Sequence, residues 1–339
     1  QKSVTLAETV INSAAYELLD DYSALWDIHN EKNKEVIWSV QNTTDPLTNG
    51  NGNQSHLFFL AHYDSQPGME RTTEYGRPFR RFNPTVYTLS RWDRRYDARY
   101  FKSFQHVWHA KYSRTLLPQQ QIGDTAIFFP GVNVGEKYYV SGANGARIEK
   151  TLGASYVQQR HNKNFRIFTP AERNGEANTG YDVGSMFPTL LKFLDPRRPD
   201  KNTANGTRDW VVMRLAEAYL IAAEAYLKAG NPVKAAEMLN VVRRRAAWPG
   251  FEDQMEISAA EVTLDFILDE RVRELLGEDE RWYDLTRTGT LIERVKDYHF
   301  PTNGLNYAAS HIAEKHLLRP IPQDQIDKSS NEYPQNPGY

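Results

Sequence analysis

The sequence predicts a mainly α-helical protein, in which a tetratricopeptide-like scaffold of helical hairpins carries a long, irregular, loop-rich insertion. Three observations support this fold class. Apolar residues recur at three- and four-residue steps near the N-terminus and again after residue 209, as on one face of a helix. Two of the later helices are joined by a connection so short that they must pack antiparallel. Between residues 46 and 185, in contrast, no helical period persists.

The first segment, residues 1–45, combines a helix with a short strand. Residues 4–19 carry one apolar helical stripe, which predicts a single helix over that range. The members of the stripe are Val4, Leu6 or Ala7, Val10, Ile11, Ala14, Ala15, Leu18 and Leu19. Residues 35–40 form a β-favouring run that ends near Asp45 and Pro46, so we expect a strand there.

The middle segment, residues 46–185, is dominated by Gly, Pro, Asn, Arg and Tyr. Loops as long as this are uncommon in compact domains, and those that exist usually serve a function. We therefore expect this segment to hold the ligand-binding loops. The helical half is expected to hold most of the folding energy.

The last segment, residues 186–339, is expected to be the tetratricopeptide-like helical domain. An apolar stripe runs from Trp210 to Gly230, and a glycine at that point is the natural C′ residue because it is free to take positive φ. Asn231 and Pro232 then supply the N-cap and the first position of a second helix, which runs to Arg245. Since one hairpin cannot bury its own apolar face, further helices are needed.

Those further helices are predicted after residue 257. Ser258 and Glu261 have the spacing of a capping box, so a helix is expected from Ser258 to about Gly277. Residues 279–295 should be helical with interruptions. The Pro-rich residues 320–339 should form an extended tail along the surface.

Composition excludes several classes of protein. The chain of 339 residues is 40% hydrophobic, which suffices for a core and excludes disordered, collagen-like and disulfide-scaffold proteins. It has no cysteine, so disulfides, thiolate metal sites and cysteine nucleophiles are impossible, while the redox compartment stays undecided. A net charge of −2 gives no general attraction to nucleic acid or to acidic membranes. The longest apolar runs are far shorter than the ~20 residues of a membrane-spanning helix.

Residues 75–112 are unusually rich in aromatic side chains and in positive charge. They contain 11 aromatic residues and a local charge of +7, whereas the whole chain is 12% aromatic and slightly acidic. Exposed Trp and Tyr rings can stack on sugar rings while Arg, Asn and Asp bind the hydroxyl groups. We take Trp92 and Trp108 as candidates for such stacking, with burial in the core as the alternative. Core positions are expected for Phe79, Phe82, Tyr87, Tyr100 and Phe104.

The same local charge is compatible with two kinds of ligand. Interleaved Arg and aromatic residues can bind single-stranded nucleic acid, but no nucleic-acid-binding motif accompanies them, so we expect no nucleic-acid partner. Guanidinium groups bind carboxylates and sulfates equally well. An acidic glycan is therefore the better use of this charge.

The sequence has no minimal signal for catalysis or for a metal. The acids of the C-terminal half are interleaved with arginines, which favours ion pairs between helices over a general acid. The members of this set are Glu270, Arg271, Glu274, Arg281 and Asp284. His106 and His109 stand three residues apart without a metalloprotease pattern, and no phosphate-binding, dinucleotide-binding or Ser-hydrolase motif occurs. We therefore expect no catalytic residue, no metal and no cofactor.

The C-terminal half resembles a known family. Residues 214–225 read RLAEAYLIAAEA, and residues 239–246 read LNVVRRRA. Further pieces follow in the family's order: DER at 269–271, ERWYDLTR at 280–287, LLRPIP at 317–322 and QNPGY at 335–339. Together they resemble the SusD/RagB family of bacterial outer-membrane nutrient-binding lipoproteins. The resemblance is looser upstream, and the family's signal peptide, lipidated cysteine and first helical repeats are expected outside this chain.

That resemblance implies a SusD-like fold and a non-catalytic, glycan-binding lipoprotein on the cell-surface face of the outer membrane. Such a protein delivers oligosaccharide to a SusC-like TonB-dependent transporter. Binding would come from the loops of residues 46–185, with Trp92, Trp108, Tyr63 and Tyr75 as stacking residues and Arg77 as a polar partner. Two alternatives stay open: a protein-interaction scaffold with no sugar site, and a glycoside hydrolase, which needs two carboxylates about 5 to 9.5 Å apart.

Overall fold

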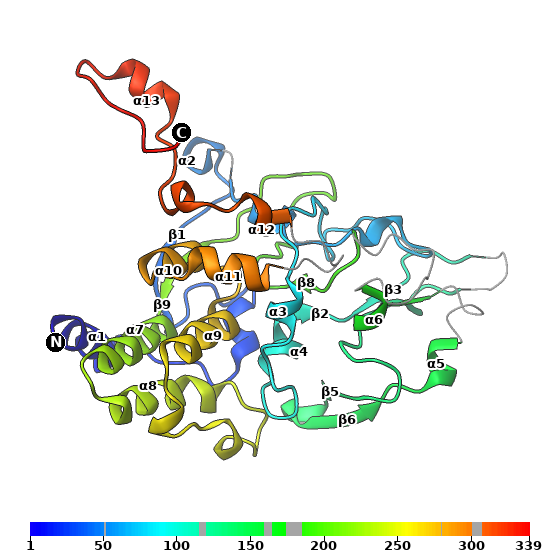
Figure 1. The fold of residues 1–339 in the computed structure, drawn as a ribbon. Helices are drawn as coiled ribbons and strands as arrows, with labels where there is room; N and C mark the ends of the chain where they lie inside the picture. The colour runs from blue at the N-terminus through cyan, green and yellow to red at the C-terminus, as the bar shows by residue number, and fades with distance from the viewer. Residues whose placement is uncertain (51, 115–119, 159–164, 174–184, 279, 300–306) are drawn as a thin grey trace.

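A computed structural model describes residues 1–50, 52–114, 120–158, 165–173, 185–278, 280–299 and 307–339. Figure 1 shows a helical half on one side and a half of loops and small sheets on the other, with α3 (Val86–Leu89) and α4 (Arg99–Ser103) between them. The chain is thus mainly helical with small sheets, as the sequence predicts. Its division into residues 1–45, 46–185 and 186–339 stays a prediction.

The hairpin predicted after residue 209 is present. Helix α7 (Leu215–Lys228) packs on α8 (Pro232–Arg245), and Gly230 between them has φ +78°. Asn231 caps α8, because its side chain accepts a hydrogen bond from the Lys234 amide at 3.1 Å, and Pro232 occupies the first turn. Ala216, Ala223 and Ala235 are completely buried in the shared core, where their small side chains let the two helices approach closely.

Two of the predicted helices are shorter than expected. The first is α1 (Lys2–Ile11), which packs on α7, and residues 14–19 are not helical. There the amide of Leu19 donates to the Glu35 carboxylate at 3.0 Å, so tertiary contacts override the helical stripe. The stripe that starts at Trp210 is also interrupted: residues 210–214 form strand β9 (Trp210–Arg214), paired antiparallel with β1 (Val36–Val40). Strand β1 itself confirms the β-favouring run.

The capping box at Ser258 exists, but it caps a single 3-10 turn, Ala259–Glu261. The α-helix begins later, as α9 (Leu264–Leu275), with Thr263 as its N-cap. Two short helices follow, α10 (Arg281–Arg287) and α11 (Leu291–Tyr298), as the interrupted pattern predicts.

In the part of the loop half that the structure describes, there are short helices and three small sheets. The helices are α2 (Pro46–Asn49), α3, α4, α5 (Ala154–Gln158) and α6 (Pro170–Arg173). The sheets pair β2 (Phe104–Gln105) with β8 (Thr189–Leu190), β3 (Val107–His109) with β4 (Thr125–Phe128) and β7 (Arg166–Ile167), and β5 (Lys137–Ser141) with β6 (Arg147–Thr151). This half has its own hydrophobic core, so it does not depend on the helical half for all of its folding energy. That core contains Tyr63, Tyr75, Trp108, Ile127, Phe129, Phe168 and Phe187.

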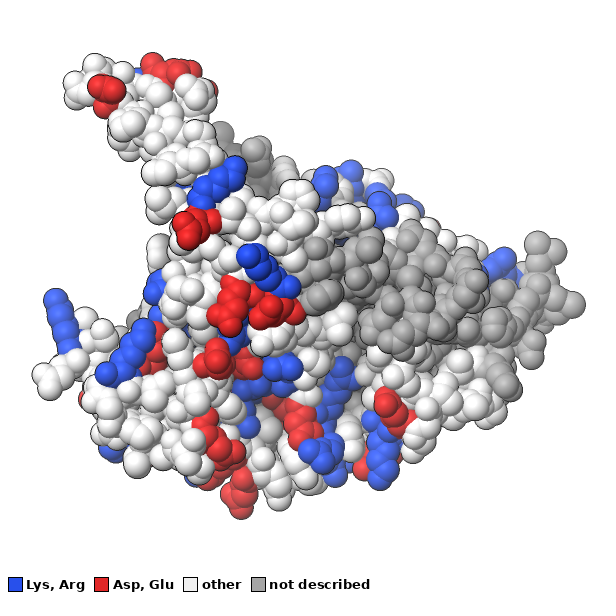
Figure 2. Space-filling model, in the orientation of Figure 1, with Lys and Arg blue, Asp and Glu red and all other residues white. Residues whose placement is uncertain are grey.

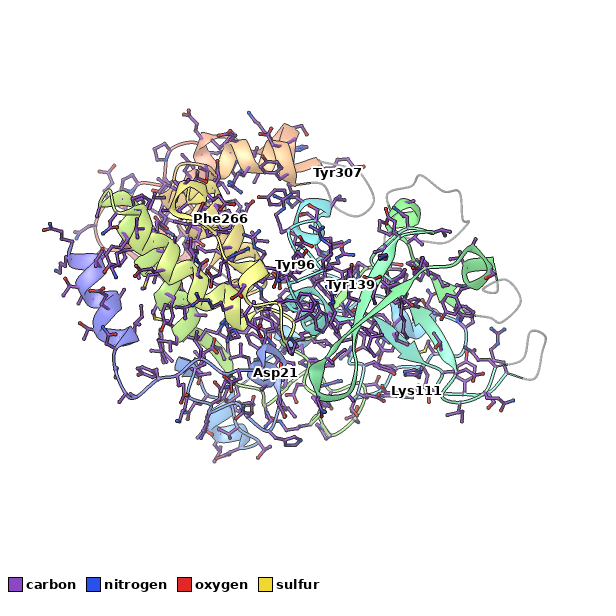
Figure 3. All side chains as sticks on the ribbon, turned by 90° about the horizontal axis from the view of Figure 1, so that it is seen from below. Asp21, Tyr96, Lys111, Tyr139, Phe266 and Tyr307 are labelled. Atoms are coloured by element: carbon purple, nitrogen blue, oxygen red, sulfur yellow. The ribbon has the colours of Figure 1, made fainter. Side chains whose placement is uncertain are left out.

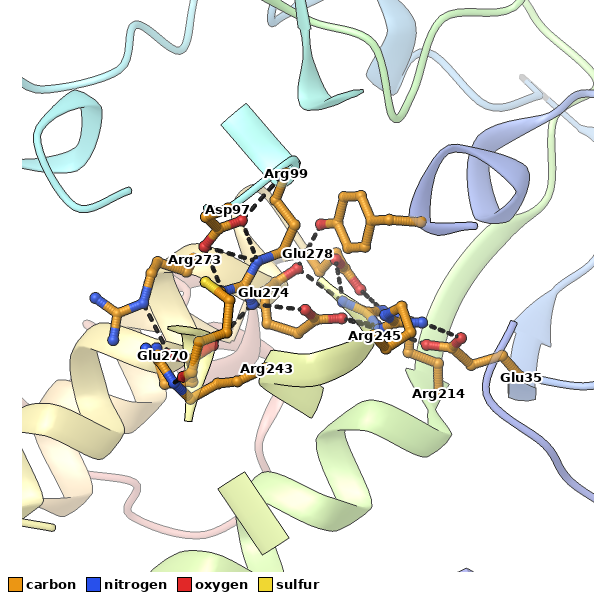
Figure 4. A network of polar contacts seen from close by, with 12 residues as sticks. Glu35, Asp97, Arg99, Arg214, Arg243, Arg245, Glu270, Arg273, Glu274 and Glu278 are labelled. Atoms are coloured by element: carbon orange, nitrogen blue, oxygen red, sulfur yellow. Dashed lines mark hydrogen bonds and ion pairs between the residues drawn. The ribbon is translucent and has the colours of Figure 1, made fainter. Parts of the chain in front are cut away.

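A buried ion-pair network joins the two halves (Figure 4). Arg214, at the end of β9, lies 2.6 Å from one carboxylate oxygen of Glu274 on α9 and 2.9 Å from Glu35. Arg99 of α4 approaches the other oxygen of Glu274 to 2.9 Å. These side chains are at most 1% exposed. Glu270 and Glu274 therefore act in the scaffold, as the sequence pattern predicts.

The C-terminal tail projects from the body instead of lying along it (Figure 1). The tail, residues 320–339, contains α13 (Gln323–Lys328), whereas α12 (Tyr307–His311) precedes it and packs on α11. The Gln335 side chain bonds both main-chain groups of Ile321, at 2.7 and 2.8 Å, and so closes the tail on itself. Within the described ranges, no helix has the length and apolar character needed to cross a membrane.

Candidate functional site

A cavity of about 680 Å³ lies where the loop segment 53–88 faces helices α9, α10 and α11. This volume is in the range of small-molecule sites. Aromatic rings dominate its lining: Phe58, Phe59, Phe82, Tyr87, Trp210, Trp282 and Tyr298. Polar side chains lie among them, including Asn53, Gln54, Thr85, Thr88, Glu280, Arg281 and His299. Rings that can stack on a sugar and polar groups that can bind hydroxyls thus share one cavity.

Phe82 reaches this cavity because the chain turns sharply just before it. Arg80 has φ +55°, in the left-handed region that non-glycine residues seldom adopt. After this turn the amides of Arg81 and Phe82 both donate to the Phe58 carbonyl at 2.9 Å. The Phe82 ring is 55% exposed, and its other face packs on Phe59 with centroids 5.1 Å apart.

A stack of rings anchors Phe82 to the interior. Phe59 stacks on Phe193 with centroids 4.7 Å apart, and Phe193 stacks on Trp210 at 4.9 Å. Trp210 belongs to β9, which joins the helical half. The loop wall of the cavity is therefore held against the scaffold by continuous aromatic packing.

The opposite wall brings Tyr87 of α3 against Tyr298 at the end of α11. Their rings stack with centroids 4.3 Å apart and planes at 23°. The Tyr87 hydroxyl donates to Asp269, and Arg294 donates to the same hydroxyl oxygen at 2.9 Å. Burial and the hydrogen bond to the Asp269 carboxylate raise the pKa of Tyr87, so the phenol stays neutral.

Three arginines line the cavity, and they differ in their ion-pair partners. Arg271 is paired with Asp284 and, at 3.0 Å, with Glu217. Arg294 is paired with Asp265 at 2.6 Å and with Asp269 at 3.1 Å. Arg281, which the sequence pattern assigns to the same ion-pair set, has no carboxylate partner among the described residues. Its Nη1 instead donates to the main-chain oxygen of Leu268 at 2.8 Å.

One cavity carboxylate belongs to the ion-pair network of the helices. Asp284 accepts hydrogen bonds from Arg271 and from Arg287, the latter at 2.7 Å, and it is 3% exposed. Both of its oxygens are thus engaged by guanidiniums, as in a structural ion pair and not as in a catalytic acid that faces a bound sugar. Across the residues placed by the structure, no cluster of three or more His, Asp or Glu side chains could hold a metal ion.

The aromatic residues predicted from the sequence as stacking candidates lie in cores. Tyr63 is 1% exposed, Tyr75 6%, Trp108 1% and Trp92 4%. Trp108 packs between Tyr75 and Phe129, and Trp92 packs on Tyr100 and Phe104. A buried ring offers no face to a sugar, so the burial of Trp92 and Trp108 favours the core alternative given above, and Tyr63 and Tyr75 are buried in the same way.

Arg77 is also turned away from the cavity. It is half-buried, and its Nη1 donates to the main-chain oxygen of Asn202 at 2.5 Å. Conversely, Phe82 and Tyr87, which the sequence reading places in the core, line the cavity. The left-handed backbone conformation of Arg80, which brings Phe82 to the cavity, cannot be recognised from a count of residue types.

Five of the nine cations in residues 75–112 are paired with carboxylates in the structure. Arg91, Arg95 and Arg99 are paired with carboxylates, as are Lys102 and Lys111. Figure 3 places Lys111 in the loop half, well apart from Phe266 of the helical half. In Figure 2 the visible blue and red side chains are interspersed over the helical half. Arg80 and Arg81 are exposed and have no ion pair with a described carboxylate, so the acidic glycan expected from this segment stays a prediction.

A second cavity, of about 470 Å³, lies within the loop half. It is bordered by residues 94–109 and by the β5–β6 hairpin, which contributes Tyr139 (Figure 3). His106 on its wall is 9% exposed, and burial lowers its pKa to about 4. Its aromatic members Tyr100, Phe104 and Phe129 are buried in the surrounding core, so it offers fewer open ring faces than the first cavity.

Comparison with known proteins identifies the family. The family model described as "SusD family" matches residues 24–339, nearly the whole chain. The chain belongs to the SusD family. This is a family of non-catalytic, cell-surface glycan-binding proteins.

The SusD relatives that match are longer than this chain. SusD-like protein P25 of Formosa agariphila is 33% identical over 149 residues, which cover 43% of this chain and 27% of that protein. SusD-like protein P38 of the same organism is 28% identical over 196 residues, covering 53% and 38%. The chain thus spans roughly a quarter to two fifths of the length of these curated relatives.

Solved structures show the same SusD-like fold. Surface glycan-binding protein A from Bacteroides thetaiotaomicron, in complex with laminarihexaose, gives a TM-score of 0.58 at 21% identity, covering 98% of this chain and 58% of that one. A laminarin-binding SusD-like protein gives 0.55 at 20% identity, covering 99% and 58%. At these identities the likeness establishes the fold and not the ligand.

Proposed function

We propose that this SusD-family chain binds an oligosaccharide in the 680 Å³ cavity and performs no chemistry on it. The observation that carries the proposal is the cavity lining, in which Phe82 and Tyr298 expose 55% and 40% of their surface beside polar side chains. Exposed rings of this kind stack on the apolar face of a sugar. The neighbours whose names record glycan or laminarin binding share the fold and support the same class of ligand.

The wider role follows from the family. In the cell, the protein would sit on the outer surface of the outer membrane through a lipid anchor outside this chain. There it would deliver its glycan to a SusC-like TonB-dependent transporter. Co-purification of the transporter with the lipidated full-length protein tests this delivery role. Failure to recover the complex in mild detergent at low salt would contradict the role.

The first rival function is a protein-interaction scaffold whose helical hairpins hold a partner and whose loops bind no sugar. Affinity electrophoresis through gels that each contain one polysaccharide separates the two functions. Retardation by at least one neutral or acidic polysaccharide supports glycan binding. Unchanged mobility across the panel, for a protein shown to be folded by circular dichroism, would favour the scaffold.

The second rival is a glycoside hydrolase. Release of reducing ends by the purified protein, from the polysaccharide that retards it most, would revive that function. We expect none, because both oxygens of the cavity carboxylate Asp284 are engaged by arginines, whereas hydrolysis needs two carboxylates that face the sugar.

A further inference from the structure

Among the residues that the structure describes, one cavity arginine has no carboxylate within ion-pair distance. Arg281 carries five N–H donors, and a single hydrogen bond, from Nη1 to the Leu268 carbonyl oxygen, is all that it makes to the residues described here. Arg271 and Arg294, on the same lining, are each held by two carboxylates. Arg281 is thus the cavity arginine whose other N–H donors have no partner among the described residues.

Its charge persists at neutral pH. Burial, reinforced by the like charge of Arg294, lowers the pKa of Arg281 to about 10, which still leaves the guanidinium protonated near pH 7. The two acids nearest in effect, Asp269 and Asp284, are each held by other arginines: Asp269 by Arg91 and Arg294, and Asp284 by Arg271 and Arg287. A partly desolvated cation without a counter-ion favours binding of an anion.

Arg319 adds a second positive charge at the edge of this cavity. Its guanidinium lies over the Trp282 ring, 4.6 Å from the centroid. Trp282 is the residue that follows Arg281 on α10, and it lines the cavity. Arg319 has no ion pair with any carboxylate in the described parts of the chain. Arg319 therefore places a second cation over an aromatic ring that lines the cavity.

We infer that the cavity selects a glycan that carries an anionic substituent, a carboxylate or a sulfate, which Arg281 binds in two-pronged fashion while Phe82 and Tyr298 stack on sugar rings. The planar fork of a guanidinium matches the paired oxygens of either group. This inference rests on the proposed function, because it names the class of sugar that the same cavity takes. It differs from the charge argument based on residues 75–112, because Arg281 and Arg319 lie outside that segment.

The test compares three oligosaccharides of equal length by titration calorimetry: laminarihexaose, a hexamer of galacturonate and a sulfated galactan hexasaccharide. We expect at least one anionic hexasaccharide to bind about tenfold or more tightly than laminarihexaose. Its affinity should fall as salt rises from about 0.05 to 0.5 M, because ion pairing is screened, whereas binding of laminarihexaose should hardly change. The anionic probe that binds more tightly shows whether the preferred substituent is a carboxylate or a sulfate.

The variant Arg281→Gln should lose about tenfold in affinity for the anionic probe and less than about twofold for the neutral one. Arg281→Lys, which keeps the charge but not the fork, should fall between wild type and Arg281→Gln. The matched control is Arg244→Gln, an exposed arginine on α8 paired with Glu256, which should change neither affinity. Because neutral-probe binding reports folding of the site, a misfolded variant is recognised directly.

Two results would overturn the inference, and they are distinguishable. Equal affinities for neutral and anionic probes, with no salt dependence, would refute the anionic preference and leave glycan binding intact. Binding of none of the three probes by folded wild-type protein would count against the proposed function and against this inference together.

Discussion

Tyr87 and Tyr298 stack with their ring centroids 4.3 Å apart, although one comes from the loop half and the other from the last turn of α11. The pair closes one wall of the aromatic cavity across the boundary between the two halves. Hydrogen bonds from Arg294 and to Asp269 fix the Tyr87 hydroxyl. The proposed binding cavity is thus formed jointly by the scaffold and the loops.

Replacing Tyr298 should separate binding from stability. Because its ring is 40% exposed, we expect Tyr298→Ala to lower the free energy of unfolding by about 1 kcal/mol or less. Oligosaccharide affinity should fall at least about fivefold, since a stacking platform is lost. Denaturant unfolding and calorimetry measure the two effects. A large loss of stability with unchanged affinity would make Tyr298 a packing residue.

Breaking the buried ion-pair network should, in contrast to Tyr298→Ala, lower the stability of the protein and not its oligosaccharide affinity. Glu274→Gln leaves Arg99 and Arg214 with one carboxylate fewer in an environment where both are at most 1% exposed. We expect a loss of about 3 to 5 kcal/mol in the free energy of unfolding, measured with urea. Lys234→Gln, which removes an exposed ion pair with Glu237, is the control and should cost under about 1 kcal/mol. Equal effects of the two substitutions would argue against a structural role for the network.

The loop half should contribute to stability as the helical half does. Leu239 is completely buried in the hairpin core, and Tyr75 is 6% exposed in the loop core, where its hydroxyl accepts a hydrogen bond from the His109 amide. We expect Leu239→Ala to cost about 2 to 5 kcal/mol and Tyr75→Ala about 3 to 5 kcal/mol. Chemical denaturation of both variants checks this. A negligible cost for Tyr75→Ala would restore the original division, in which folding energy lies in the helical half.

Two buried histidines should make the protein less stable in mild acid. Burial lowers the pKa of His56, and that of His106, to about 4, whereas an unfolded histidine titrates near 6.5. Between these values the unfolded chain binds more protons, so stability is fully present above pH 6.5 and falls as the pH drops toward 4. Each histidine can account for up to about 3 kcal/mol.

Urea unfolding at pH 7.5, 6.0 and 5.0 measures this dependence in a window above the titration of most carboxylates. In His56→Gln, whose amide can still donate to the Ala204 carbonyl, the slope should be reduced. A wild-type stability that stays constant from pH 7.5 to 5.0 would contradict buried, neutral histidines.

The scaffold was largely predictable because its signals are local. The period of α7 and α8, Gly230 at the turn and Asn231 with Pro232 at the next helix start all act within a few residues. Where prediction failed, distant residues decided the structure. Trp210 belongs to a helical stripe by spacing, but pairing with β1, far away in the sequence, makes it part of a strand.

The site was less predictable, because exposure is a tertiary property. Trp108 and Phe82 come from the same aromatic segment, yet one is 1% and the other 55% exposed. The left-handed turn at Arg80 and the stack from Phe59 to Trp210 make this difference. Neither is visible as a count of aromatic residues. The helical wall of the cavity also lies outside residues 46–185, to which the sequence confines the binding loops.

The measurement that tests the central claim most directly is calorimetric titration of wild-type protein, Phe82→Ala and Tyr283→Ala with the hexasaccharide that wild type binds best. Phe82 lines the cavity, whereas Tyr283 is a similarly exposed ring, at 64%, on α10 outside the cavity lining. If the cavity binds glycan, Phe82→Ala should weaken binding at least about fivefold and Tyr283→Ala less than about twofold. If the wild-type protein binds the hexasaccharide and Phe82→Ala binds it with unchanged affinity, the glycan site lies elsewhere on the molecule.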